Sequence, residues 1–141
     1  MSKFQDRHPL EVAEEQGLLM VTPERFELFI DIDEETEERQ RAMLAKGILT
    51  LRKNGSTVET IKETISKSGK GWHVYLRAEV PGWDSEDPIV RSALQAMIGS
   101  DPVKEILSLF RVWKHADRPP CTFFETVGES SLAFDGDDIP W

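Results

Sequence analysis

The 141-residue sequence contains a single cysteine, Cys121, so no disulfide can form within the chain and no zinc site can be built from several cysteines. It has no recognisable signal peptide and no apolar run long enough to cross a membrane, which predicts a cytoplasmic protein with no membrane partner. A repeat of solenoid length is also missing. At 39% hydrophobic residues, the chain is sufficient for one compact domain with one core.

The charge is strongly acidic overall but unevenly distributed. A net charge of −9 means that the surface as a whole repels nucleic acid. However, residues 31–38 carry six carboxylates and residues 129–141 carry four, whereas residues 52–77 hold six Lys or Arg against two Glu. A basic strip beside a metal-binding acidic cluster suits a substrate that carries phosphate.

Hydrophobic periodicity and helix-capping residues predict an α+β fold with an antiparallel or mixed sheet packed against helices. The expected helices cover residues 8–17, 34–54, 89–98 and 103–114, and the expected strands cover 18–21, 25–33, 72–80 and 121–125. Residues 56–66 fit either type, and we favour a strand because a hairpin would place its turn beside the acidic end of strand 25–33. We expect the apolar stripes of the last two helices to pack in the core, and these consist of Leu94, Met97, Ile106, Phe110 and Trp113.

The strand at residues 25–33 ends in two aspartates on one face. Phe26, Leu28, Ile30 and Ile32 alternate with Arg25, Glu27, Phe29, Asp31 and Asp33. Asp31 and Asp33 therefore project side by side from the other, solvent-facing side. Two neighbouring carboxylates repel each other unless a cation lies between them, and Mg²⁺ or Mn²⁺ is the usual occupant. The alternative is a solvated acidic strand end without a ligand.

A glycine-containing turn precedes the strand at residues 72–80. Ser66, Lys67, Ser68 and Lys70 supply two hydroxyls and two ammonium groups, and such a turn can bind phosphate through backbone N–H groups and charge. The Walker pattern is absent. The alternatives are an ordinary polar hairpin turn and, for His73, a histidine that serves only packing.

Asp-Ile-Asp at the end of one strand, followed by Ser-Gly-Lys-Gly-Trp-His-Val at the start of another, resembles motifs I and II of the archaeo-eukaryotic primase superfamily. The resemblance implies a core like the RNA-recognition motif within one domain at residues 1–127. It also implies a two-metal site of Mg²⁺ or Mn²⁺ on Asp31 and Asp33, with the triphosphate on Ser68 and His73. The third motif of the family is an apolar residue and a carboxylate, for which Phe124-Glu125 is the best candidate and Phe134-Asp135 the second.

The last residues resemble the acidic tip of bacterial single-stranded-DNA-binding proteins. We expect residues 128–141 to form a flexible docking tail whose terminal aromatic residue and carboxylates bind replication or repair proteins. A tail that only improves solubility would not need the Ile-Pro-Trp sequence. The residues expected to dock are Asp135, Asp137, Asp138, Ile139, Pro140 and Trp141.

Together these patterns predict a DNA-replication protein, encoded by a phage or mobile element, that binds single-stranded DNA and a nucleoside triphosphate. The leading hypothesis is primase-like nucleotidyl transfer with Asp31, Asp33 and His73 as catalytic residues and Glu125 as a further metal ligand. The rival is a non-catalytic single-stranded-DNA-binding protein on a primase-derived fold, in which Phe29, Trp72 and Tyr75 stack on bases. A metal-dependent nuclease would leave the basic turn unexplained. The expected nucleotide or DNA contacts are Ser66, Lys67, Ser68, Lys70, Trp72, Tyr75 and Arg77.

Overall fold

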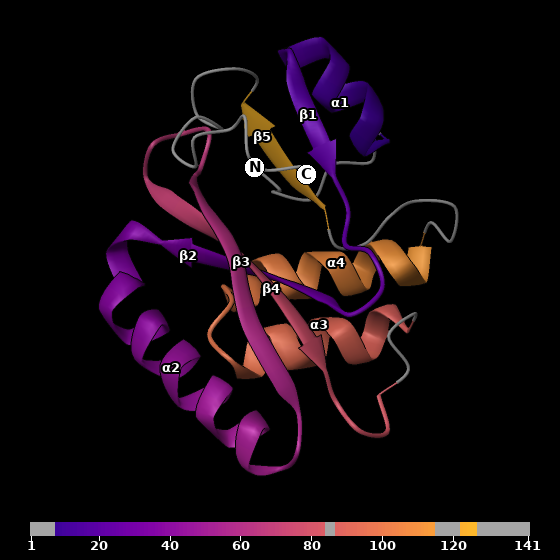
Figure 1. Ribbon diagram of the computed structural model, residues 1–141. Coiled ribbons are helices and arrows are strands. Elements are labelled where there is room, and N and C mark those ends of the chain that lie inside the picture. Colours follow the sequence, from indigo (N-terminus) through magenta and orange to yellow (C-terminus); the bar gives the residue numbers. More distant parts are fainter. Residues whose placement is uncertain (1–7, 84–86, 115–121, 127–141) are drawn as a thin grey trace.

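The computed structural model describes residues 8–83, 87–114 and 122–126, and it confirms the α+β class with antiparallel sheets. The strand assignment at residues 56–66 is also confirmed. The elements, labelled in Figure 1, follow one another as α1 (Pro9–Gln16), β1 (Leu18–Val21), β2 (Glu27–Asp33), the 3₁₀ turn η1 (Glu34–Thr36), α2 (Glu37–Lys53), β3 (Thr57–Ile65), β4 (Gly71–Glu79), α3 (Pro88–Met97), α4 (Pro102–Lys114) and β5 (Phe123–Thr126).

A three-stranded antiparallel sheet in the order β2-β4-β3 carries the predicted motifs. Strands β3 and β4 form the expected hairpin, in which Ile65 pairs with Trp72 at the turn. In the pairing of β2 with β4, Asp31 lies opposite His73 and Asp33 lies opposite Gly71. The register therefore brings the two motifs together at one end of the sheet.

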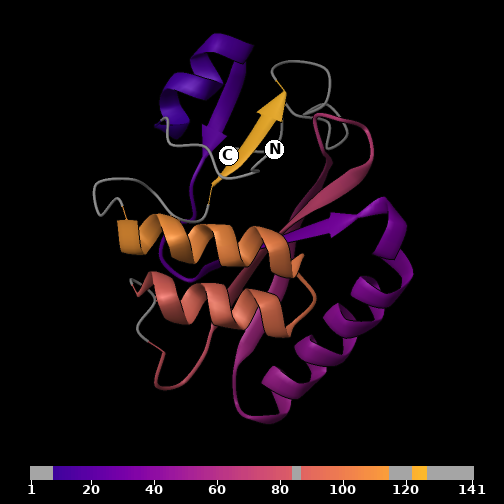
Figure 2. The ribbon, with the colours of Figure 1, turned by 180° about the vertical axis from the view of Figure 1, so that it is seen from behind.

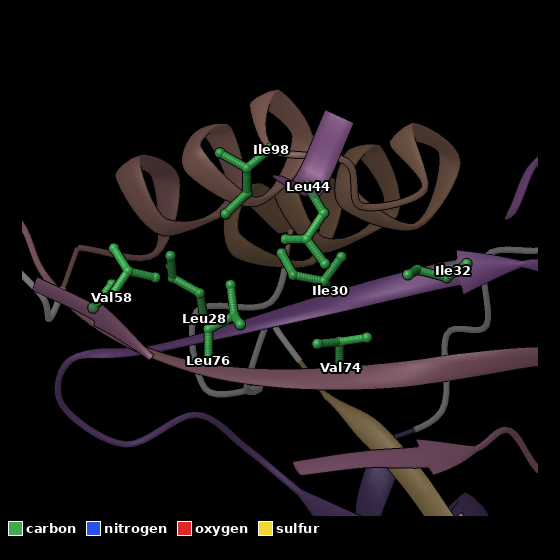
Figure 3. Close-up of a cluster of buried hydrophobic side chains, with 9 residues drawn as sticks. Leu28, Ile30, Ile32, Leu44, Val58, Val74, Leu76 and Ile98 are labelled. Atoms are coloured by element: carbon green, nitrogen blue, oxygen red, sulfur yellow. The ribbon is translucent and has the colours of Figure 1, made fainter. Parts of the chain in front are cut away.

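One face of this sheet forms the main hydrophobic core. Leu28, Ile30 and Ile32 of β2 are fully buried and pack with Val74 and Leu76 of β4. Figure 3 shows these side chains pointing towards the helical layer, where Leu44 of α2 and Ile98 complete the cluster. The period of two in the sequence thus correctly identified the core face of β2.

A second, smaller cluster covers part of the opposite face. Figure 1 shows α1, β1 and β5 together at one end of the molecule, and β1 pairs with β5 in a separate two-stranded sheet. Phe123 of β5 stacks on Phe29 with ring centroids 5.0 Å apart, and Tyr75 meets Phe29 edge-to-face at 4.7 Å. Apolar side chains therefore cover one face of the three-stranded sheet and part of the other.

Helices α3 and α4 lie side by side, as the salmon and orange ribbons of Figure 2 show, with their polar faces inward. The prediction of apolar core stripes is wrong for Met97, Ile106 and Trp113, which are 73%, 52% and 84% exposed, and Phe110 is 48% exposed. Leu94 does pack against the core. Residues with polar side chains are buried instead, and these are Arg91, Ser92, Gln95, Glu105 and Ser108.

The polar side of α3 faces inward because β2 is an edge strand, and the backbone groups along its free edge need hydrogen-bond partners. The Phe29 N–H donates to Gln95 Oε1 at 2.7 Å, and Arg91 Nε donates to the Glu27 carbonyl at 3.0 Å. The polar side of α3 thus takes the place of a fourth strand. Within the described residues, no helix combines the length and apolar character that crossing a bilayer requires.

Candidate functional site

An open pocket of about 370 Å³ lies where the end of β2 meets the β3–β4 turn and the start of α4. It brings together carboxylates, cations, hydroxyls and aromatic rings from segments that are far apart in the sequence. Those predicted from the sequence are Asp31, Asp33, Ser66, Lys67, Ser68, Lys70 and His73. The prediction that the Asp pair and the basic turn share one site is consistent with this arrangement.

Gln40 of α2 holds the acidic end of β2 in place. Its Oε1 accepts from the Asp33 N–H at 2.8 Å, and its Nε2 donates to the carbonyls of Asp31 at 2.8 Å and Gly99 at 2.7 Å. Gln40 is only 4% exposed. The side chain therefore ties β2, α2 and the α3–α4 connection together immediately behind the pocket.

The two aspartates differ in environment. Asp33 is exposed, and its Oδ1 accepts from the Glu35 N–H at 2.9 Å, which caps η1. The Asp31 side chain is one-quarter exposed. Burial raises the pKa of Asp31, attraction by Lys104 and His73 acts against this rise, and repulsion by Asp101 and Asp33 adds to it. A cation in the pocket would stabilise the ionised form of Asp31.

At two positions of the β3–β4 turn, Gly69 and Gly71, the structure favours glycine over any residue with a side chain. Gly69 has φ +74°, a conformation that side chains disfavour. A Cβ on Gly71 would lie 2.4 Å from the Ile32 carbonyl oxygen, so the turn approaches β2 more closely than any other residue permits. Ser66 Oγ and Ser68 Oγ lie 3.2 Å apart, and Lys67 and Lys70 are exposed beside them.

His73 is held between a carboxylate and a ring. Its Nδ1 lies 2.8 Å from Glu125 Oε2, and its ring stacks on Phe123 with centroids 3.9 Å apart. The opposite ring atom, Nε2, lies 4.0 Å from Asp31 Oδ1 at the pocket. A carboxylate at Nδ1 selects the tautomer or protonation state with hydrogen on Nδ1. The pairing thus orients His73 so that Nε2 faces the pocket.

Glu125 has a different position from the one predicted. It is 6% exposed and does not line the pocket, whereas its neighbour Phe124 does. Its Oε2 accepts from Thr64 Oγ1 at 2.8 Å and from the Tyr75 hydroxyl in addition to contacting His73. Burial acts to raise the pKa of Glu125, but His73, Tyr75 and Thr64 together lower it. In this geometry Glu125 contacts His73 from outside the pocket, and its predicted role as a metal ligand stays a prediction.

Four predicted nucleotide or DNA contacts lie away from the pocket. Tyr75 is 4% exposed and Phe29 is 2% exposed, so neither ring presents a face on which a base can stack. Trp72 packs beside the main core, with the Arg41 guanidinium 5.3 Å from its ring. Arg77 lies near Phe26, at the other end of β4. Strand β5 covers the sheet face that carries Phe29 and Tyr75, whereas Trp72 lies on the opposite, core face.

The pocket also contains residues that the sequence analysis did not assign to it. Asp101 is brought there because its N–H donates to the Asp31 carbonyl at 2.8 Å. Lys104 donates to the Thr122 carbonyl at 2.7 Å and lies 4.6 Å from the Phe123 ring centroid. The Asp101-Pro102 pair predicted the start of α4 from the sequence, but it gave no indication that this helix end lies beside Asp31. The added lining residues are Asp101, Lys104, Arg111, Thr122 and Phe123, and Phe124 of the expected third motif lines the pocket as well.

Among residues 8–83, 87–114 and 122–126, no three His, Cys, Asp or Glu side chains gather closely enough to hold a metal ion by themselves. The predicted tail at 128–141, including Asp135 and Trp141, lies outside the described residues. Comparisons of the chain with protein-family models, with curated proteins and with solved structures found no match.

Proposed function

We propose that the pocket binds the triphosphate of a nucleotide together with a divalent cation, and that the protein performs primase-like nucleotidyl transfer on single-stranded DNA. The observation that carries this proposal is the common pocket of Asp31, Asp33 and the Ser66–Lys70 turn. An acidic side and a basic side in one pocket match a cation bound to phosphate. The proposal is also supported by the resemblance of the two motifs to those of the archaeo-eukaryotic primase superfamily. That resemblance implies a core like the RNA-recognition motif.

The donor set fits a cation that arrives with its substrate. Mg²⁺ is commonly held by one or two carboxylates, with phosphate oxygens and water completing its octahedron. Asp31 and Asp33 supply two carboxylates, and the repulsion among Asp31, Asp33 and Asp101 favours a cation there. When bound, Mg²⁺ or Mn²⁺ would polarise phosphate oxygens and help to deprotonate an attacking 3′-hydroxyl.

The protein's own cations would neutralise the phosphates. Lys67 and Lys70 approach from the turn, and Lys104 and Arg111 approach from α4. His73 would donate a hydrogen bond from Nε2 when its ring is protonated, with Glu125 stabilising that charge. In the transfer, the 3′-oxygen would bond to the α-phosphorus while the bond to the bridging oxygen breaks and pyrophosphate leaves.

The test is a titration of the full chain with Mn²⁺ and a nucleoside triphosphate, with and without a single-stranded DNA template, followed by an assay for extended product. We expect metal-dependent triphosphate binding that is lost in Asp31→Asn with Asp33→Asn. Glu34→Gln with Glu38→Gln removes the same charge at exposed positions of η1 and α2 and serves as the control. Nucleotide binding that ignores Mn²⁺ and both carboxylates would contradict the proposal.

The second candidate is single-stranded-DNA binding without catalysis, favoured by the position of Glu125, which leaves the pocket without a third carboxylate of motif type. In this case Phe124, 5.9 Å from Lys67 Nζ, would stack on a base at the pocket rim. Tight DNA binding without metal dependence or product would favour this candidate. Lys67→Ala with Lys70→Ala should reduce the salt dependence of DNA binding by roughly one ion for each phosphate that is no longer neutralised. The matched control is Lys46→Ala with Lys53→Ala, at exposed positions of α2.

The acidic tail would serve either function by recruiting replication or repair proteins through Asp135, Asp137, Asp138, Ile139, Pro140 and Trp141. Its resemblance to the tips of bacterial single-stranded-DNA-binding proteins supports this role. Such partners and a template place the proposed activity in the cytoplasm, with the protein encoded by a phage or mobile element.

A further inference from the structure

The outward sides of the adjacent helices α3 and α4 both carry exposed apolar side chains, and we call this surface the α3–α4 face. Figure 2 shows the two helices side by side on the side of the molecule nearest the viewer. The side chains that define the surface are Ile89, Val90 and Met97 of α3 and Val103, Ile106 and Trp113 of α4, and they are 36–84% exposed. Exposed apolar residues that occur singly are normal, but a surface shared by two adjacent helices is characteristic of an interface.

The orientation of these helices follows from the fold. Turning the apolar side inward would remove Gln95 from the Phe29 N–H and Arg91 from the Glu27 carbonyl. It would also expose the hydrogen bonds that Gln95 and Ser100 donate to Glu105, at 2.9 and 2.8 Å. The buried polar network therefore keeps the apolar side facing outward.

The chemistry of the face restricts its partner. The charged residues of both helices are engaged elsewhere or lie at the margin. Arg91 and Glu105 are buried, Lys104 contacts the Thr122 carbonyl, Arg111 lines the pocket, and Lys114 is at the end of α4. Nucleic acid and acidic peptides bind through cations, which the centre of this face does not offer. An apolar helical surface is the matching partner.

We propose that the α3–α4 face binds the same face of a second copy of this chain and forms a two-fold symmetric dimer. Six apolar residues that are 36–84% exposed present a surface on the order of the 800 Å² that each partner of a stable interface buries. Positions 103, 106 and 113 have the spacing of core positions in a helical bundle, so two helix pairs form a four-helix layer. Lys104 and Arg111 lie on a different side of α4, so each pocket stays open to its own ligand.

The test is the mass of the full chain in solution, measured by sedimentation or light scattering over a range of micromolar concentrations. We expect twice the mass of one chain, together with an unfolding midpoint that rises with protein concentration. Met97→Glu with Ile106→Glu places like charges opposite each other across the symmetric interface and should produce a monomer. The milder Ile106→Ala with Trp113→Ala should weaken the dimer by tenfold or more while keeping the helical circular-dichroism signal.

Leu19→Glu with Leu49→Glu is the control, because it adds the same charge at exposed leucines of β1 and α2 outside the face. This variant should remain dimeric. A monomeric wild type at all concentrations would overturn the proposal, as would a dimer that both α3–α4 variants leave unchanged. If deletion of residues 128–141 turned a monomer into a dimer, the tail rather than a second copy would be the occupant, and the proposal would be wrong.

Discussion

At the scale of single residues, the contact between Glu125 and His73 has the greatest consequence for function. The sequence placed Glu125 next to an apolar residue at the end of the domain and predicted a metal ligand. In the structure, its Oε2 is 2.8 Å from His73 Nδ1 and also accepts hydrogen bonds from Thr64 and Tyr75. We therefore regard Glu125 as a positioning residue that acts through His73.

Replacing Glu125 with Gln should separate these two roles. The amide keeps the size of the side chain but loses the charge that supports a protonated imidazole, so triphosphate affinity should fall roughly tenfold, the value of a charge-assisted hydrogen bond. Affinity for Mn²⁺ alone should stay unchanged, as calorimetry can measure. Glu59→Gln, at an exposed position on β3, is the control. Selective loss of Mn²⁺ binding in Glu125→Gln would restore the metal-ligand assignment.

Glu105 provides a second prediction, which concerns stability against pH. Burial raises the pKa of Glu105 above the ordinary 4.5, although hydrogen bonds from Ser100 and Gln95 lower it in part. The folded protein thus holds this proton more tightly than the unfolded chain. The stability from Glu105 is complete below the ordinary pKa and is lost as the pH rises through the raised pKa of the folded state.

Glu105→Gln should remove this loss, since the amide stays neutral and fits the same hydrogen-bonding surroundings. We compare the free energy of unfolding of the variant with that of the wild type. The difference in favour of the variant should increase as the pH rises from the ordinary 4.5 through the raised pKa of Glu105, by ~1.4 kcal/mol for each pKa unit of the shift. Urea denaturation across this range is the measurement. A difference that is constant with pH would show that Glu105 titrates as it does in the unfolded chain.

At the scale of elements, the edge strand β2 determines how its neighbours are arranged. The backbone N–H groups of Phe29 and Asp31 donate hydrogen bonds to the side chains of Gln95 and Ser100, and the Asp33 N–H donates to Gln40. The helices around β2 are therefore positioned by hydrogen bonds as well as by apolar packing. This explains why α3, whose amphipathic pattern is the strongest among the helices of the described residues, keeps its apolar side outward.

Gln40→Leu should destabilise the protein by about 2–4 kcal/mol, because it leaves the Asp33 N–H and the carbonyls of Asp31 and Gly99 without their partner in a buried place. Triphosphate binding should weaken as well, since the Asp pair loses its support. Chemical denaturation and nucleotide titration measure the two effects. Arg39→Leu, at the neighbouring exposed position, should change stability by less than about 0.5 kcal/mol, and equal losses in both variants would contradict the role of Gln40.

At the scale of the whole molecule, charge and apolar surface are divided among separate regions. The pocket combines both signs of charge, the α3–α4 face is apolar, and four carboxylates lie within residues 129–141 without a basic residue beside them. Each region is suited to a different ligand. The proposed nucleotide, the second copy and the tail partner would therefore not compete.

Deletion of Asp137–Trp141 should leave the thermal unfolding midpoint and nucleotide binding nearly unchanged, because a docking peptide does not belong to the core. It should abolish binding to purified replication proteins that recognise the tails of bacterial single-stranded-DNA-binding proteins, and Trp141→Ala should do most of the same damage. Asp135→Asn is a milder variant that keeps the aromatic anchor. A decrease of several kcal/mol in stability on truncation, as for a deleted core aromatic, would show that Trp141 packs in the domain.

The sequence by itself determined the local features of this protein. Alternation identified β2 and its core side chains Leu28 and Ile30, Asp-Pro pairs marked the starts of α3 and α4, and the glycine turn defined the β3–β4 hairpin. These signals are local because strand period, helix caps and turns depend on neighbouring residues. The pairing of β2 with β4, which is not a local feature, then places the basic turn beside Asp33.

Only the tertiary structure decided which surfaces are covered. The position of β5 buries Phe29 and Tyr75 and places Glu125 against His73, a contact across 52 residues of sequence. The edge of β2 decides that Gln95, rather than Met97, faces inward, because an unsatisfied buried N–H costs more than an exposed apolar side chain. Neither outcome is encoded in local periodicity, since each depends on which backbone groups another strand leaves unpaired.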